Sequence, residues 1–105
     1  SMIAVDPGLG FGKSVSQNLA LLQGLPRLVA DGRPVLVGAS RKSFLGALTG
    51  AKAPADRDGE SIVAAIEAWR RGAAVLRVHE VAGHQRGIRI AEAIEGRGDS
   101  DFSIR

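Results

Sequence analysis

The sequence predicts an α/β protein built on a parallel sheet, and three short segments are the basis of this prediction. In each, an apolar run of strand length ends in a polar or glycine-rich turn, and a helical pattern follows. The three runs begin near Ile3, Val35 and Ala74. A repeated strand, turn and helix is the βα unit of a parallel sheet. Ligands of such sheets bind beyond the carboxyl ends of the strands, where polar residues become candidates for a site.

The first unit is expected to hold a strand over residues 2–5, a glycine-rich loop and a helix that begins near Ser14. Pro26 is expected to interrupt or restart this helix, because its ring clashes with the preceding turn. Gly32 is a suitable residue to end it.

The second unit begins with a strand over residues 34–37. This run is apolar throughout, as expected for a strand covered on both faces. A short helix over 42–48 follows at once, and residues 49–55 are expected to form a loop.

The next helix is expected over residues 57–71. Four apolar residues fall on one face of it, at positions i, i+3, i+4 and i+7: Ile62, Ala65, Ile66 and Trp69. This stripe exceeds what one sheet face needs as a cover. We therefore expect the chain to self-associate through helix faces, because exposed apolar patches usually mark interfaces.

The third unit comprises a strand over 74–78 and a last helix over 83–94. Three residues of this helix are expected to face inward: Ile90, Ala91 and Ile94. His84 and Gln85 are expected on the surface. Residues 1–105 are expected to form one domain, with a frayed, flexible tail over 97–105.

Composition excludes several classes of protein. The chain has 105 residues, 45% of them hydrophobic, which is enough for one domain with a modest core. It contains no cysteine, and no apolar stretch approaches the roughly 20 residues of a membrane span. No signal-peptide pattern opens the chain, and Ser1 with Met2 resembles an artificial start. We expect a cytoplasmic protein without a membrane partner.

The net charge of +3 and the pI of about 10.2 weakly favour anionic partners, although a solvated basic surface is the better explanation. Aromatic residues make up 4% of the chain and tyrosine is absent. A stacking surface for single-stranded nucleic acid is therefore not expected. The two histidines and scattered carboxylates show no metal-ligand spacing, so no metal site is expected in this chain.

Seven polar residues follow the three predicted strands and are expected to converge on one rim of the sheet: Asp6, Ser40, Arg41, Lys42, Ser43, Arg77 and His79. A carboxylate that faces several cations suggests a substrate with a polar ring and an anionic group. The glycine-rich loop does not match a nucleotide-binding P-loop, because Pro7 stands where that motif requires glycine.

Each group of candidates also has a purely structural alternative. Asp6 either pairs with an amino-substituted heterocycle or caps its own turn before Pro7. The segment 40–43 is either an anion site at a helix start or an ordinary serine N-cap with solvated basic residues. Arg77 and His79 are two apart on one strand and share a face, where they bind an anion or form a structural ion pair with Glu80 or Asp6.

Together these segments resemble dihydropteroate synthase, the pterin-binding enzyme of folate biosynthesis. Three motifs match in order: Asp6-Pro7-Gly8-x-Gly10-Phe11-x-Lys13 with Asn18 following, Val37-Gly38-x-Ser40-Arg41-Lys42-Ser43-Phe44, and Arg77-Val78-His79-Glu80-Val81. Glu80 replaces the aspartate usual in the family and keeps its charge. The match covers about residues 3–95 and implies the last three βα units of a TIM (β/α)8 barrel, which needs about 250 residues.

The resemblance implies a transferase that joins 6-hydroxymethyl-7,8-dihydropterin diphosphate to p-aminobenzoate and releases pyrophosphate. It assigns pterin binding to Asp6, Lys42 and Arg77, and diphosphate binding to Arg77 and His79. It assigns the p-aminobenzoate pocket, which sulfonamides occupy in this family, to Gly10, Phe11, Gly38 and Ser43. Lys42, Arg77 and His79 are the catalytic candidates, with Ser40 and Arg41 in support.

The resemblance also implies a Mg²⁺ ion whose ligand lies outside this chain, and a homodimer that forms through the carboxyl-terminal helices. Three strands do not close a barrel, so we expect the isolated chain to be inactive. An inactive pterin-binding or dimerisation fragment is the main alternative. A related pterin-dependent methyltransferase is a third possibility, which the motif from Ser40 to Ser43 disfavours because such an enzyme has no use for a benzoate site.

Overall fold

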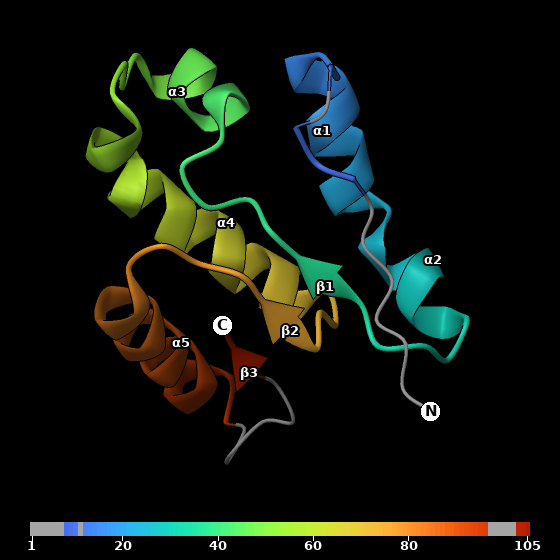
Figure 1. Cartoon of the computed structure of the whole chain (residues 1–105). Coiled ribbons are helices and arrows are strands. Elements are labelled where there is room, and N and C mark those ends of the chain that lie inside the picture. The colour runs from blue at the N-terminus through green and yellow to red at the C-terminus, as the bar shows by residue number, and fades with distance from the viewer. Residues whose placement is uncertain (1–7, 11, 97–102) are drawn as a thin grey trace.

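The structure is a computed structural model that describes residues 8–10, 12–96 and 103–105. The predicted strand over 2–5 and the candidates Asp6 and Phe11 lie outside these residues. The elements follow in the order α1 (Val15–Gln23), α2 (Leu25–Ala30), β1 (Leu36–Val37), α3 (Ser43–Thr49), a 3₁₀ helix η1 (Pro54–Arg57), α4 (Asp58–Arg70), β2 (Val75–Leu76), α5 (Val81–Glu95) and β3 (Ser103–Ile104) (Figure 1).

The predicted α/β class with parallel strands is confirmed. The strands form one sheet in the order β1-β2-β3, and both neighbouring pairs are parallel. Leu36 pairs with Val75, and Leu76 pairs with Ile104. The segment α3, η1 and α4 connects β1 to β2 along the chain. Helix α4 lies side by side with α5, while α1 and α2 occupy the opposite flank of the molecule (Figure 1).

The first helical segment follows its local signals. Ser14 caps α1 by accepting the backbone N–H of Gln17, and the Gln17 side chain accepts the N–H of Ser14 in return. The chain breaks at Gly24, and α2 begins with Pro26 in its first turn, as expected of a residue that lacks an N–H. Gly32, just after α2, has a φ of 91°, a value that favours glycine.

Residues 103–105, the last part of the tail that was expected to fray, pair with the sheet. The N–H groups of Ser103 and Arg105 donate to the carbonyl oxygens of Ala74 and Leu76, both at 2.8 Å. The N–H of Val78 donates to Arg105 at 2.8 Å in return. The edge of β2 offers unpaired backbone groups, and residues 103–105 satisfy them by forming β3.

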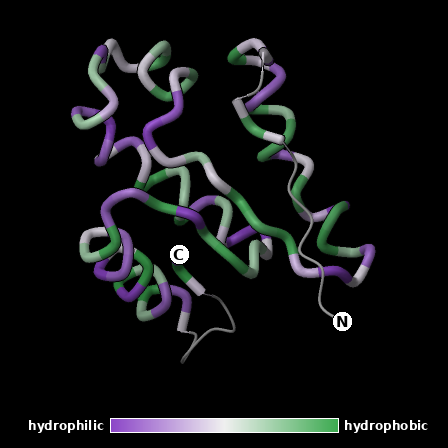
Figure 2. The backbone as a smooth tube through the Cα atoms, in the orientation of Figure 1, coloured by the Kyte–Doolittle hydropathy of each residue, from purple (hydrophilic) through white to green (hydrophobic). Residues whose placement is uncertain are grey.

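The buried core lies between the sheet and the helices, and it includes Val35, Val37 and Leu76 of the strand segments. Figure 2 shows hydrophobic residues along β1 and β2, and hydrophilic residues over the segment that joins β1 to α3. This contrast places the polar residues beyond the carboxyl end of β1, where the sequence predicts a site.

The interpretation of the α4 stripe as an interface is wrong. Ala65 and Trp69 are 5% and 2% exposed, and Ile66 packs against the core. The small side chains of Ala64 and Ala68 are buried beside them, so α4 sits close to the sheet. The stripe therefore covers the core of this chain.

The expected inward face of α5 is wrong at two of its three positions. Ala91 is buried, but Ile90 and Ile94 are 62% and 74% exposed. His84 and Ile88 are fully buried instead, at i and i+4 of a face that continues to Ala91. The helix begins two residues earlier than predicted, and its packing against α4 turns a different face toward the core.

Candidate active site

The glycine-rich loop is attached to α1 through Asn18, which is 1% exposed. The N–H of Gly10 donates to Asn18 Oδ1 at 2.7 Å, and Asn18 Nδ2 donates to the Ser14 carbonyl at 3.0 Å. A buried amide needs such partners, and here they hold the loop against the start of the helix. Asn18 follows the first motif of the resemblance in the sequence, but only the structure shows that it holds the loop.

Lys42 lies across Gly10, which joins two of the predicted site segments. A Cβ added at Gly10 would stand 2.9 Å from Lys42 Cδ and 3.3 Å from Nζ. Gly10 also has a φ of 95°, so a side chain is excluded by both conformation and space. The absence of a side chain at Gly10 therefore lets the Lys42 ammonium approach the loop.

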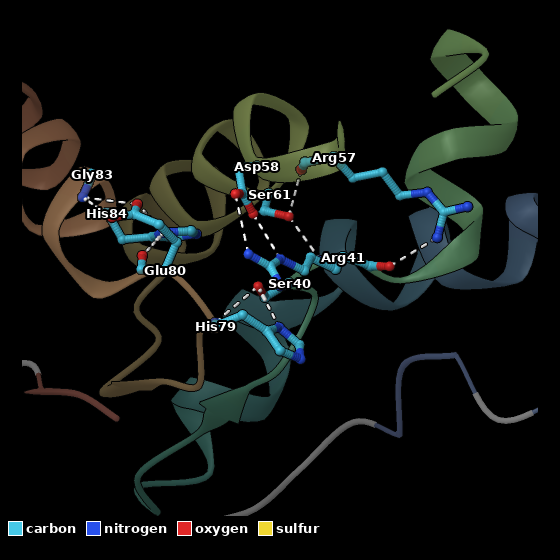
Figure 3. Close-up of polar contacts among 9 residues, drawn as sticks. All are labelled: Ser40, Arg41, Arg57, Asp58, Ser61, His79, Glu80, Gly83 and His84. Atoms are coloured by element: carbon cyan, nitrogen blue, oxygen red, sulfur yellow. Dashed lines mark hydrogen bonds and ion pairs between the residues drawn. The ribbon is translucent and has the colours of Figure 1, made fainter. Parts of the chain in front are cut away.

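Ser40 and His79 connect the loops that follow β1 and β2 (Figure 3). Ser40 Oγ lies 2.9 Å from His79 Nδ1 and accepts the backbone N–H of His79 at 3.2 Å. Ser40 is 8% exposed, whereas His79 is exposed. A neutral imidazole that accepts the serine hydroxyl at Nδ1 carries its proton on Nε2, where it can donate to a ligand.

Arg77 and His79 are both exposed and share one face of their segment, as predicted. Leu76 points the other way, into the core, and is 1% exposed. A Cβ at Gly38 would lie 3.7 Å from Arg77 Cβ, so these two candidates are neighbours. Glu80 does not pair with either cation: its carboxylate accepts the N–H of Gly83 at 2.9 and 2.8 Å and caps α5. The expected alternative of an ion pair with Glu80 is therefore wrong.

Arg41 turns away from the rim toward α4. Its Nε and Nη2 donate to the two carboxylate oxygens of Asp58 at 2.8 and 3.2 Å. This hydrogen-bonded pair holds the pKa of Asp58 below its usual value of 3.8 and raises the pKa of Arg41. Asp58 neutralises Arg41, and Lys42 and Arg77 are the other two cations among the candidate residues.

The alternative of an ordinary serine N-cap before α3 is also wrong. The residue at the N-cap position is Lys42, and it makes no side-chain capping hydrogen bond. Ser43 is the first residue of α3 and is exposed. Ser40 contacts His79, and Ser43 is exposed at the start of α3.

Sequence reasoning missed four residues around these loops. Arg57, Asp58 and Ser61 contact Arg41, and nothing in the local pattern links the start of one helix to a residue 16 to 20 positions earlier. His84, expected on the surface, is fully buried, and its Nδ1 lies 2.5 Å from the Glu80 carbonyl.

Within the part of the chain that the structure describes, no helix combines the length and apolar character needed to cross a membrane. The described residues also include no group of three or more histidine, aspartate or glutamate side chains that could hold a metal ion. A groove of about 490 Å³ lies between α1, α3 and α4, but its lining is mainly apolar and contains none of the predicted site residues.

The rim thus combines a glycine-rich loop, the cations Lys42 and Arg77, and a histidine beyond the ends of parallel strands. Residues 1–79 match the family model described as pterin binding enzyme, and the chain belongs to this family. The resemblance inferred from the three motifs is confirmed by comparison with individual proteins.

The chain is 43% identical over 93 residues to the dihydropteroate synthase of Neisseria meningitidis serogroup C, covering 88% of this chain and 33% of that protein. It is 44% identical over 96 residues to the dihydropteroate synthase of Mycobacterium leprae, covering 87% of this chain and 34% of the relative.

Solved structures agree with this. The dihydropteroate synthase of Xanthomonas albilineans in complex with 7,8-dihydropteroate matches with a TM-score of 0.86 and 44% identity, over 90% of this chain and 37% of the other. The Thermus thermophilus enzyme in complex with 4-aminobenzoate matches with a TM-score of 0.86 and 45% identity, over 90% and 39%. The chain spans about a third of the length of the curated relatives it matches.

Proposed function

We propose that this chain supplies part of the active site of a dihydropteroate synthase. In the proposed reaction, the amine nitrogen of 4-aminobenzoate bonds to the methylene carbon of 6-hydroxymethyl-7,8-dihydropterin diphosphate. The carbon–oxygen bond to the diphosphate breaks, its electrons leave with pyrophosphate, and the amine loses one proton. Similarity to enzymes solved with 7,8-dihydropteroate and 4-aminobenzoate supports the substrate classes.

The observation on which this proposal depends is the convergence of three loops on one rim. The Ser40–His79 contact joins two of them, and Lys42 lies across Gly10 of the third. Asp58 neutralises Arg41, and Lys42 and Arg77 are the other two cations among the candidate residues. A rim of this kind suits a polar heterocycle that carries an anionic leaving group.

Each candidate residue takes one proposed role. Asp6 binds the amino-pyrimidine edge of the pterin, and Lys42 and Arg77 contact its ring. Arg77 and His79 bind the diphosphate and stabilise the negative charge that develops as it leaves. The proposed pocket for 4-aminobenzoate consists of Gly10, Phe11, Gly38 and Ser43, with the Ser43 hydroxyl donating to the carboxylate.

A Mg²⁺ ion does not fit the residues at hand. The described residues bring no three acidic or histidine side chains together, and the polar residues at the rim are mainly cations and hydroxyls. Mg²⁺ prefers carboxylate and other oxygen ligands. We therefore place its protein ligand in the remainder of a full-length enzyme and assign no step of the reaction to this chain through the metal.

The larger assembly is part of the same proposal. The three βα segments would form one domain that is the last part of a (β/α)8 barrel, with the remaining strands supplied by the rest of the protein. A cytoplasmic homodimer follows from the resemblance. The exposed Ile90 and Ile94 on α5 support an interface there better than the buried stripe of α4.

A chimera tests the function directly. Residues 8–96 would replace the matching segment of the Neisseria meningitidis serogroup C enzyme, and dihydropteroate formation would be measured with both substrates and Mg²⁺. We expect turnover by the chimera and none by the 105-residue chain alone, since positioning of reactants contributes about 7–11 kcal/mol that one wall of a site does not supply. A folded chimera without turnover would favour the alternative of an inactive pterin-binding or dimerisation fragment.

Two variants of the chimera test the assigned pockets. Ser43→Ala should raise the KM for 4-aminobenzoate about tenfold and leave that for the pterin diphosphate nearly unchanged, because one hydrogen bond to a charged group is lost. His79→Ala should weaken binding of pyrophosphate and spare a pterin without diphosphate. Equal effects on both ligands in either variant would contradict the assignment.

A further inference from the structure

Arg41 adopts an unusual backbone conformation in the middle of the candidate site. Its φ is 58°, and among the described residues only glycines share a positive φ with it. The left-handed region is unfavourable for a residue with a Cβ, so the surrounding structure must hold Arg41 there. Its two neighbours, Ser40 and Lys42, both belong to the rim. The conformation of Arg41 therefore sets the path of the chain between β1 and α3.

Arg57 at the end of η1 and two residues at the start of α4, Asp58 and Ser61, hold Arg41 through separate contacts (Figure 3). The backbone N–H of Arg41 donates to Ser61 Oγ at 2.7 Å, and its carbonyl accepts Arg57 Nη1 at 3.0 Å. Its guanidinium donates to both carboxylate oxygens of Asp58, at 2.8 and 3.2 Å. Both peptide groups and the side chain of one residue are thus tied to a single helical turn.

These three residues also hold one another and the loop before them. Ser61, which is 1% exposed, donates its hydroxyl to the Arg57 carbonyl at 2.6 Å, so its oxygen is oriented to accept the Arg41 N–H. Arg57 donates to the carbonyls of Ala51 at 2.9 Å and Lys52 at 2.6 Å. The guanidinium of Arg57 therefore donates to three carbonyl oxygens, those of Ala51, Lys52 and Arg41. The two loop carbonyls hold it in the position from which it reaches Arg41.

On the other side of Arg41 lie the contacts that build the rim. Ser40 reaches His79 at 2.9 Å, and Lys42 crosses Gly10. We propose that Arg57, Asp58 and Ser61 are positioning residues that keep Arg41 in its left-handed conformation and thereby place Ser40 and Lys42. The geometric part of this inference stands by itself, and its effect on ligand binding rests on the proposed function.

The test uses the chimera described above and the variant Ser61→Ala, which removes the acceptor of the Arg41 N–H. We expect the KM for the pterin diphosphate to rise about three- to tenfold, the effect of one net hydrogen bond on the placement of Lys42 and of the Ser40–His79 contact. Asp58→Asn keeps the shape of the side chain and should act in the same direction. Glu67→Gln is the matched control, because it removes contacts to Arg70 and Arg71 on the same helix away from the rim.

Rescue separates positioning from a general loss of stability. Glycine adopts a positive φ without penalty. Arg41→Gly added to Ser61→Ala should therefore bring the KM most of the way back to its value in the parent. A variant that only weakens the fold would lower the Tm without this recovery. Unchanged KM in both Ser61→Ala and Asp58→Asn, or a double variant no better than Ser61→Ala, would overturn the inference.

A crystal structure of the chimera with Ser61→Ala and Asp58→Asn combined makes the outcome independent of catalysis. We expect Arg41 to relax to a negative φ and the Ser40–His79 contact to open. Arg41 remaining left-handed with two of its three partners altered would overturn the inference, even if the parent shows turnover. A parent chimera without turnover would count against the proposed function, while the relaxed Arg41 would still support the positioning role.

Discussion

Gly46 lies where α3 passes the loop that follows it, and the structure leaves no room for a side chain there. A Cβ at Gly46 would overlap the Ala51 carbonyl oxygen and lie 2.5 Å from Arg57 Nε. Arg57 Nε donates to that same carbonyl at 2.9 Å. The substitution Gly46→Ala must therefore move the loop or displace the guanidinium that holds Arg41.

The expected cost follows from these contacts. Overpacking a filled site costs about 1–3 kcal/mol, and loss of a hydrogen bond to a charged group costs about 1.5–3 kcal/mol. Alanine offsets about 1 kcal/mol of this through its higher helix propensity. We expect Gly46→Ala to lower the free energy of unfolding by about 2–4 kcal/mol, which corresponds to a fall in Tm of roughly 10 °C or more.

Urea unfolding of the 105-residue chain measures this change. Trp69 is the single tryptophan, it is 2% exposed, and its fluorescence reports on the core together with the circular dichroism of the helices. Gly59→Ala is the matched control, because a Cβ there meets nothing within 4 Å. It should stabilise α4 by about 0.5–1 kcal/mol. Gly46→Ala with the stability of the parent, beside a control that behaves as expected, would refute the steric argument.

Four further predictions concern other contacts. Arg41 lowers the pKa of Asp58 in the folded chain. The contribution of Asp58 to stability is therefore present above its unfolded pKa of about 3.8 and is lost as the pH falls below that value. Asp58→Asn should reduce the loss of stability that the parent shows between about pH 6 and pH 3. Asn18→Leu removes the acceptor of the Gly10 N–H and should destabilise the chain by about 1–3 kcal/mol in urea unfolding. Ile90→Glu combined with Ile94→Glu should shift any dimer to monomer in analytical ultracentrifugation without lowering the Tm, since both side chains are exposed; an unchanged dimer would move the interface elsewhere. Deletion of residues 103–105 exposes the edge of β2 and should increase hydrogen exchange at Val78, whose N–H donates to Arg105.

The sequence alone determined the features that depend on the backbone and on neighbouring residues. Proline and glycine chemistry predicted a helix break beside Pro26, which the structure has at Gly24, and the turn at Gly32. The alternation of a strand put Leu76 inside and Arg77 outside. The order of strand, polar turn and helix predicted the parallel sheet and the rim beyond it. Each of these features follows from dihedral preference or side-chain periodicity within a few residues.

Only the tertiary structure decided which distant groups meet. The face of α5 that is buried depends on its packing against α4, which turned His84 inward and Ile90 outward against the local expectation. The strand β3 exists because β2 has an open edge, and not because of any strong pattern in residues 103–105. Asp58 and Ser61 reach Arg41 across a helix, a loop and a turn, and no periodicity relates them. Such contacts depend on the free energy of packing the whole chain, in which local preference is one small term.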